Sequence, residues 1–124
     1  MKKHPILLIL IVFSLFISSC KYDYILPEVV PPVVTGVSFL KQVAPIFSTG
    51  DKCISCHKAG ATSPDLTAAN AFAQISGLIN TATPAESKLY SFPSPATSTH
   101  TWKKYTEGEA AIVLQWITEG AKNN

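Results

Sequence analysis

The chain has 124 residues, a formal net charge of +2 and a hydrophobic fraction of 47%. This length fits one small domain. Ten lysines face eight carboxylates, with no run of more than two basic residues, so we do not expect binding to nucleic acid. The three cysteines are an odd number, which excludes a framework made only of disulfides within the chain. At least one cysteine therefore has a separate role.

Residues 1–19 are typical of a secretory signal peptide. Lys2 and Lys3 precede an apolar run over 6–17. Twelve residues span only about 18 Å as a helix, less than a hydrocarbon core of about 30 Å, so a permanent transmembrane helix is the weaker interpretation. We therefore predict that 1–19 are removed on export.

The tetrad ISSC at 17–20 resembles the lipobox of bacterial lipoproteins. In that family the cysteine is acylated and becomes the first mature residue. The resemblance implies a lipid on Cys20 and a membrane-anchored protein of the cell envelope. By the same resemblance, a residue other than aspartate after the lipidated cysteine, here Lys21, favours transfer to the outer membrane over retention at the inner membrane. There the protein would face the periplasm or the exterior. The alternative is an ordinary signal peptide followed by an unmodified cysteine.

The segment KYDYILPEVVPPVVTGV at 21–37 contains three prolines and no helical period. Proline removes a backbone donor and favours extended backbone. We predict that residues 20–37 form an extended linker that begins at the lipidated Cys20. An edge strand packed on the domain is the alternative.

Residues 38–124 are predicted to form one all-α domain of four short helices. Phe39, Val43 and Phe47 recur at four-residue spacing, which predicts an amphipathic helix of about ten residues ended by Gly50 and Asp51. No strand alternation is visible. A domain of this size usually needs a covalent or metal-based support, because it buries a small fraction of its surface.

Local signals place the three remaining helices. The segment 67–79 has an apolar face, with Thr67 as its expected N-cap. The residues Thr83 to Glu86 read as a capping box that opens a helix through Leu89 or Tyr90, before a loop over 91–101. A second capping box, Thr106 to Glu109, opens a helix that Gly120 ends, with a buried face of Ile112, Val113, Trp116 and Ile117.

The chemistry is carried by CISCH at 53–57. This is the C-x-x-C-H pattern that attaches haem c: Cys53 and Cys56 add to the two vinyl groups, and His57 is the proximal iron ligand. Export of the chain agrees with attachment outside the cytoplasm.

Two other chemistries use similar spacings. A disulfide or redox dithiol of thioredoxin type would follow a strand, whereas a helix is predicted before Cys53. A zinc site lacks a second cysteine pair, and adjacent Cys56 and His57 are poorly placed to join one tetrahedral ion. Haem attachment is therefore the leading interpretation.

With these residues in place, 38–124 resembles the class I single-haem cytochrome c domain, in particular small versions in membrane-anchored lipoproteins of Bacteroidetes-like bacteria. The resemblance rests on FLKQVAPIF before the motif, CISCH, ESKLY, and the ending IVLQWITEGAKNN. It implies helices packed around one covalent haem c per chain. It also implies that the first and last helices cross, so that residues such as Phe39, Val43 and Phe47 meet Ile112, Val113 and Trp116.

The sequence departs from this family at the sixth iron ligand. Such cytochromes usually place a methionine in the loop before the last helix, but the only methionine here is Met1, which leaves with the signal peptide. His100 lies in that loop, and we predict that it is the distal ligand. Lys103 or Tyr105 on the iron, or a five-coordinate iron with an open face, are the alternatives.

Other residues around the expected haem have open roles. The resemblance implies that a carbonyl near Pro64 accepts the second ring N–H of His57, although Pro64 is equally explained as a turn residue. Trp102 and Tyr105 either bind a propionate or pack at the haem edge. Four lysines either steer an acidic redox partner or form an ordinary solvated surface: Lys52, Lys58, Lys103 and Lys104.

The predicted function is electron transfer by a monomeric, lipid-anchored cytochrome that exchanges electrons with redox partner proteins. No catalytic constellation is visible beyond the haem, so we do not expect an enzyme. A haem enzyme or a sensor of peroxide or gases is the alternative if the sixth position is open or labile. A haem-free lipoprotein with a disulfide is the third possibility.

Overall fold

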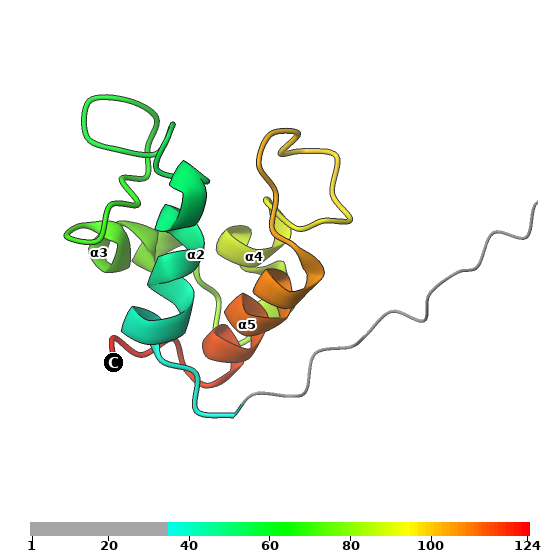
Figure 1. The fold of residues 1–124 in the computed structure, drawn as a ribbon. Helices are drawn as coiled ribbons and strands as arrows, with labels where there is room; N and C mark the ends of the chain where they lie inside the picture. Colours follow the sequence, from blue (N-terminus) through cyan, green and yellow to red (C-terminus); the bar gives the residue numbers. More distant parts are fainter. Residues whose placement is uncertain (1–34) are drawn as a thin grey trace, which may run out of the picture.

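The computed structural model describes residues 35–124 (Figure 1). The predicted signal peptide, Cys20 and most of the linker lie outside the described residues. The described residues form an all-helical domain of short helices and contain no strand. No helix among them is long and apolar enough to cross a membrane.

The first helical segment follows the predicted range and consists of three consecutive pieces. Ser38 caps it by accepting a hydrogen bond from the Lys41 N–H. Because Pro45 has no N–H to donate, the helix widens before it into a π turn, in which the Ala44 N–H donates to the Phe39 carbonyl. The pieces are η1 (Phe39–Val43), α2 (Ala44–Ser48) and η2 (Thr49–Asp51).

The helix predicted over 67–79 is shorter than expected. Its α-helical part is α3 (Ala71–Ile75), followed by the 3-10 turn η3 (Ser76–Leu78). Thr67 is not its N-cap, because the Asp65 carboxylate accepts hydrogen bonds from the Thr67 N–H and hydroxyl and from the Asn70 amide. This Asx turn holds 65–70 outside the helix.

The first predicted capping box is wrong in its geometry. The Thr83 hydroxyl donates to the Glu86 carboxylate instead of accepting from a backbone N–H. The segment divides into a 3-10 turn and a single helical turn around buried Ser87, whose hydroxyl accepts from the Asn80 N–H and donates to the Asn80 carbonyl. These pieces are η4 (Pro84–Glu86) and α4 (Lys88–Ser91).

The second predicted capping box is confirmed. Thr106 accepts from the Glu109 N–H, and the Glu109 carboxylate accepts from the Thr106 N–H. It opens the longest described helix, α5 (Glu107–Thr118), and the chain leaves the helix at Gly120 with φ +95°. Of the predicted face, Val113, Trp116 and Ile117 are buried, whereas Ile112 is only partly buried.

The core lies where the first and last helices cross. The ring centroids of Phe39 and Trp116 are 5.3 Å apart, and Phe72 of α3 packs edge-on against Phe39 at 5.1 Å. Val43, Phe47 and the buried face of α5 continue the same cluster. The expected contact between the first helix and α5 is therefore present.

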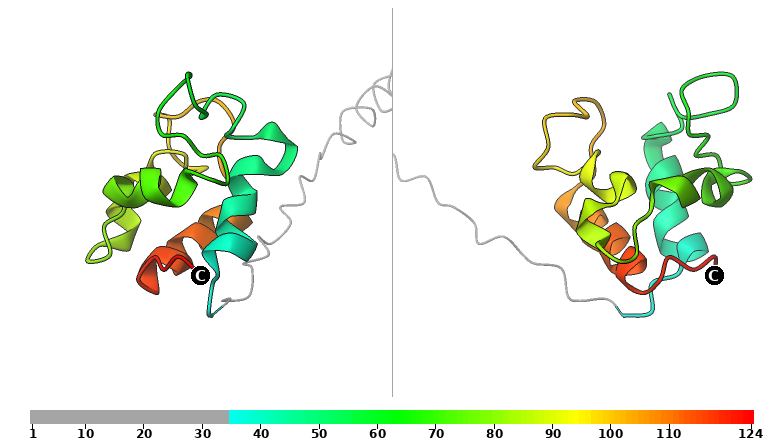
Figure 2. Two further views of the ribbon diagram at one scale, coloured as in Figure 1. Left: turned by 90° about the vertical axis from the view of Figure 1, so that its left-hand side faces the viewer. Right: turned by 180° about the vertical axis from the view of Figure 1, so that it is seen from behind.

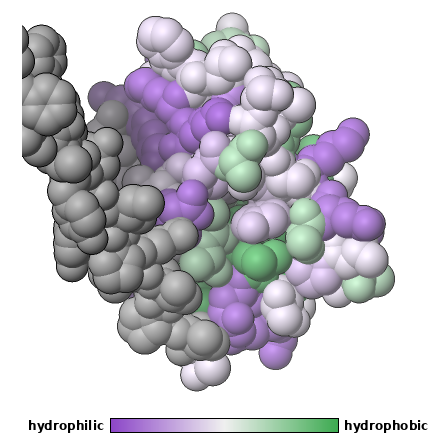
Figure 3. Space-filling model, turned by 90° about the vertical axis from the view of Figure 1, so that its right-hand side faces the viewer, coloured by the Kyte–Doolittle hydropathy of each residue, from purple (hydrophilic) through white to green (hydrophobic). Residues whose placement is uncertain are grey.

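The first and last described residues lie on one side of the domain, and the loops that contain CISCH and His100 lie on the opposite side. In Figures 1 and 2 the loops over 52–66 and 92–106 are both at the top, on opposite sides in Figure 1, while residues 35–38 and the C-terminus are at the bottom. On the side that is to the right in Figure 1, hydrophilic and hydrophobic residues are mixed and the strongly hydrophobic area is small (Figure 3). Scattered apolar residues of this kind are normal on protein surfaces.

Candidate functional site

The CISCH segment is a compact turn fixed to the end of α2. The N–H groups of Cys53 and Ile54 donate to the Phe47 carbonyl. Within the motif, the N–H groups of Cys56 and His57 both donate to the Cys53 carbonyl, at 3.1 and 2.8 Å. The turn therefore holds the two thiols and the imidazole on one short segment.

The His57 ring is held by the loop that follows the motif. Its Nδ1 lies 3.3 Å from the Pro64 carbonyl oxygen, so Nδ1–H donates to that oxygen. The expected carbonyl contact is present. Such a contact fixes the tautomer and leaves Nε2 with its lone pair free to bind a metal.

His100 lies in the loop over 92–106, which closes at its base. The Tyr105 N–H donates to the Pro93 carbonyl, and the Tyr105 hydroxyl donates to the Leu89 carbonyl. The His100 ring packs edge-on against Phe92, with centroids 5.8 Å apart. Among the described residues, no group forms a hydrogen bond with its buried Nδ1. A buried ring nitrogen without a partner is costly unless a ligand meets it.

The two histidines face each other from the two loops. Their ring centroids are 6.3 Å apart, and the ring planes are parallel to within 24°. A metal bound at about 2 Å from one nitrogen of each imidazole would separate the ring centres by roughly 6 Å. The distance between the ring centres is therefore close to the one that a metal atom shared by two imidazoles would give.

A cavity of about 330 Å³ lies between these loops. Both cysteines of the motif, both histidines and Pro64 line it. Several apolar wall residues were not anticipated from the sequence, because their approach depends on the tertiary fold: Leu66, Leu78, Leu89, Phe92 and Pro93. An apolar cavity with a few polar groups is typical of a cofactor site.

The donor set fits a haem better than a bare metal ion. In the described part of the chain, no three His, Cys, Asp or Glu side chains come together as a metal site. A haem requires only two protein ligands, because the porphyrin supplies the other four. The apolar faces of a haem also agree with the mostly apolar cavity walls.

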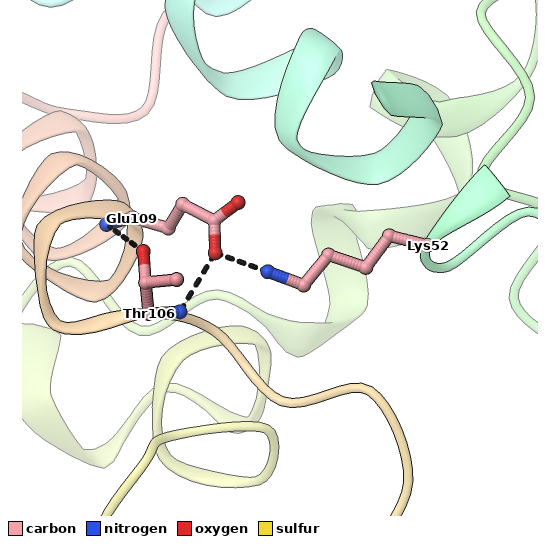
Figure 4. A network of polar contacts seen from close by, with 3 residues as sticks. All are labelled: Lys52, Thr106 and Glu109. Atoms are coloured by element: carbon pink, nitrogen blue, oxygen red, sulfur yellow. Dashed lines mark hydrogen bonds and ion pairs between the residues drawn. The ribbon is translucent and has the colours of Figure 1, made fainter. Parts of the chain in front are cut away.

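Lys52 and Lys103 lie at the cavity, but both ammonium groups are hydrogen-bonded to the protein. Lys52 pairs with the Glu109 carboxylate, which also completes the capping box with Thr106 (Figure 4). Burial acts to raise the pKa of the Glu109 carboxyl, but the hydrogen bonds from Lys52 and the Thr106 N–H outweigh it, and this pKa lies below its ordinary value.

The other expected basic residues differ in their surroundings. Lys103 Nζ donates to the Asp51 carbonyl at 2.9 Å and to the Ser55 hydroxyl at 3.0 Å. Lys104 Nζ donates to two carbonyls of its own loop. Lys58 is exposed. Of the four lysines proposed to steer a partner, three are therefore engaged in hydrogen bonds within the domain.

The two aromatic residues of the loop have different positions. Tyr105 is buried, which raises the pKa of its hydroxyl. This hydroxyl donates a hydrogen bond to the Leu89 carbonyl. Trp102 lies at the cavity with 71% of its surface exposed. Tyr105 and Lys103, the alternative iron ligands, both direct their polar atoms to protein acceptors. Packing is therefore the role that the structure gives Tyr105.

The Cys53 thiol lacks the lowered pKa that is typical of a redox dithiol. Both cysteines are free, and burial raises the pKa of the Cys53 thiol. A reactive cysteine of a redox C-x-x-C has a lowered pKa. The helical turn that precedes Cys53 also takes the place of the strand expected in that class.

Comparisons with protein-family models, with curated proteins and with solved structures found no match. The site is therefore interpreted from its own residues and geometry.

Proposed function

We propose that this protein is an electron carrier with one covalently bound haem c. Cys53 and Cys56 would hold the haem through thioether bonds, and His57 and His100 would be its proximal and distal iron ligands. The bound group would supply an iron that alternates between the ferrous and ferric states. The fold proposed here is a cytochrome c-like arrangement of short helices around that haem.

The observation that carries the proposal is the pair of parallel imidazoles. They are 6.3 Å apart on facing loops, in a cavity that both motif thiols also line. The protein contributes two further features: the Pro64 carbonyl orients His57, and the apolar walls would shield a bound haem from water. Two imidazole ligands would lower the reduction potential relative to a histidine and methionine pair.

The proposal includes a membrane anchor. Cys20 would carry the lipid, and residues 21–37 would tether the domain in the cell envelope, at the outer membrane facing the periplasm or the exterior. Acyl chains contribute about 0.8 kcal/mol per buried methylene, so more than one chain anchors firmly. The tethered domain would meet its redox partner proteins as a monomer.

A test of haem attachment uses the full chain expressed with haem-attachment machinery. We expect haem staining of the band after denaturing electrophoresis, and a low-spin visible spectrum without a methionine–iron band in the near infrared. Replacing both cysteines, C53S/C56S, should abolish the covalent stain. An unstained wild-type band would refute the proposal and favour the haem-free lipoprotein.

A second function is favoured by one observation. The His57 ring is held by a carbonyl, whereas neither ring nitrogen of His100 forms a hydrogen bond within the described part of the chain. Whichever nitrogen of His100 binds the iron, the other one therefore lacks such support. A ligand without such support exchanges more readily. Binding of peroxide, nitric oxide or carbon monoxide at the distal position would then follow. Rapid carbon monoxide binding by the reduced wild type would favour this sensor or enzyme, and inertness would favour the electron carrier.

A further inference from the structure

Lys103 connects the two loops that form the cavity. Its Nζ donates to the Asp51 carbonyl at 2.9 Å and to the Ser55 hydroxyl at 3.0 Å. Asp51 lies two residues before Cys53, and Ser55 lies two residues after it. The Lys103 ammonium, from the His100 loop, therefore binds one acceptor before Cys53 and one after it.

The backbone at both ends of this contact is unusual. Lys103 has φ +53°, a value that L residues with long side chains rarely adopt, and Asp51 has φ +52°, which the short side chain of aspartate tolerates more easily. Such conformations persist where the surrounding contacts determine them, and they concentrate at functional sites. At Lys103 the left-handed turn follows His100 by three residues, and its side chain reaches back across 52 positions of the sequence to Asp51.

We propose that Lys103 is a positioning residue that fixes the His100 loop to the CISCH segment and so holds His100 opposite His57. The part that concerns the iron rests on the proposed function. Ser55 is available for this contact, because C-x-x-C-H chemistry uses only the two cysteines and the histidine. The Asp51 carbonyl and the Ser55 hydroxyl supply two acceptors for one ammonium. Two hydrogen bonds fix the orientation of the Lys103 side chain, and its charge strengthens both of them.

The neighbouring Lys104 provides a matched control. Its Nζ donates to the carbonyls of Pro95 and Thr97, both in the same loop. Replacing either lysine by methionine removes one positive charge and keeps most of the side-chain length. Only K103M removes hydrogen bonds between the two loops.

The first measurement is hydrogen–deuterium exchange of the amides over 95–105 in the purified full chain. We expect exchange in K103M to be about fivefold faster than in wild type, the factor for about one lost hydrogen bond. We expect K104M to leave the contact with the motif segment in place and K103R to restore protection, because arginine donates to the same acceptors. Equal exchange in wild type and K103M would overturn the proposal.

The second measurement is the rate of carbon monoxide binding to the reduced haem protein. We expect K103M to bind about fivefold faster than wild type or K104M, while its resting spectrum stays low-spin. Faster exchange with an unchanged carbon monoxide rate would show a contact that does not position His100, and would overturn that role. If the wild type holds no covalent haem, the proposed function fails, and the exchange experiment still decides whether Lys103 joins the loops.

Discussion

His57 and His100 differ in what holds their rings. The Pro64 carbonyl accepts from Nδ1 of His57, whereas the ring of His100 relies on packing against Phe92. The orientation of His100 therefore depends on its loop. This difference makes His100 the residue at which the proposed iron coordination is most easily altered.

The change H100A tests the distal assignment directly. We expect the low-spin spectrum of the wild type to become high-spin, because the alternative donors Lys103 and Tyr105 bind other acceptors. Visible absorption of the oxidised protein measures the change. T101A is the control, since Thr101 is an exposed residue of the same loop. A low-spin spectrum retained in H100A would contradict the assignment.

The sequence indicated part of the site and missed part of it for a physical reason. Cys53, Cys56 and His57 are neighbours in the chain, so their spacing alone predicted that they act together. His100 was selected because no methionine remains after removal of the signal peptide. The role of Lys103 was not predictable, because its acceptors Asp51 and Ser55 lie about fifty positions away in the sequence and meet it only in the folded chain.

At the scale of one element, the N-terminus of α5 links the last helix to the motif. Thr106 and Glu109 form the capping box, and the same Glu109 carboxylate pairs with Lys52, the residue before Cys53 (Figure 4). A carboxylate in the first turn also interacts favourably with the helix dipole. One side chain therefore stabilises the helix start and attaches it to the motif segment.

Three variants separate these contributions. T106A should destabilise the domain by about 1 kcal/mol, the usual cost of losing an N-cap. E109Q should cost about as much, because it removes the charge that pairs with Lys52 and weakens the box. E107Q is the matched control in the same first turn, where Glu107 is exposed and forms no such box. Urea unfolding measures all three, and equal destabilisation by E107Q and E109Q would contradict the special role of Glu109.

Which helices the sequence predicted correctly depended on local competition for hydrogen bonds. The box at Thr106 formed although Glu109 also pairs with Lys52, because one carboxylate oxygen of Glu109 accepts from both Lys52 and the Thr106 N–H. At 65–70 the Asp65 carboxylate captured Thr67 and Asn70, and the predicted helix began four residues late. Competition by side chains also explains the failed box at Thr83. The Thr83 hydroxyl donates to the Glu86 carboxylate, so these two side chains pair with each other rather than with the backbone.

At the scale of the whole molecule, the two ends of the domain are joined by side chains of its C-terminal part. The Glu119 carboxylate accepts from the N–H groups of Gly36 and Val37, at 2.8 and 2.7 Å. The Asn124 side chain accepts from the Phe39 N–H at 2.9 Å. These bonds satisfy donors ahead of and at the start of the first helix, which has no intrahelical acceptor for them. These bonds form a seam between the two ends of the domain, and they lie at the end away from the loops over 52–66 and 92–106 (Figure 1).

Glu119 gives this seam a pH dependence. Hydrogen bonds from Gln115, Gly36 and Val37 lower the pKa of its carboxyl below the ordinary 4.5. A carboxyl whose pKa is lower in the folded state stabilises the fold above pH 4.5, and that stabilisation is lost as the pH falls through the lowered value. E119Q, which resembles the protonated carboxyl, should therefore be less stable than wild type at about pH 6, and this deficit should be smaller at about pH 3. N124A is the control, because it removes a bond of the same seam without a titrating group, so its destabilisation should not vary with pH. Urea unfolding midpoints at both pH values measure the two effects. A deficit of E119Q that is as large at the acidic pH would show that Glu119 acts by shape alone and not through its charge.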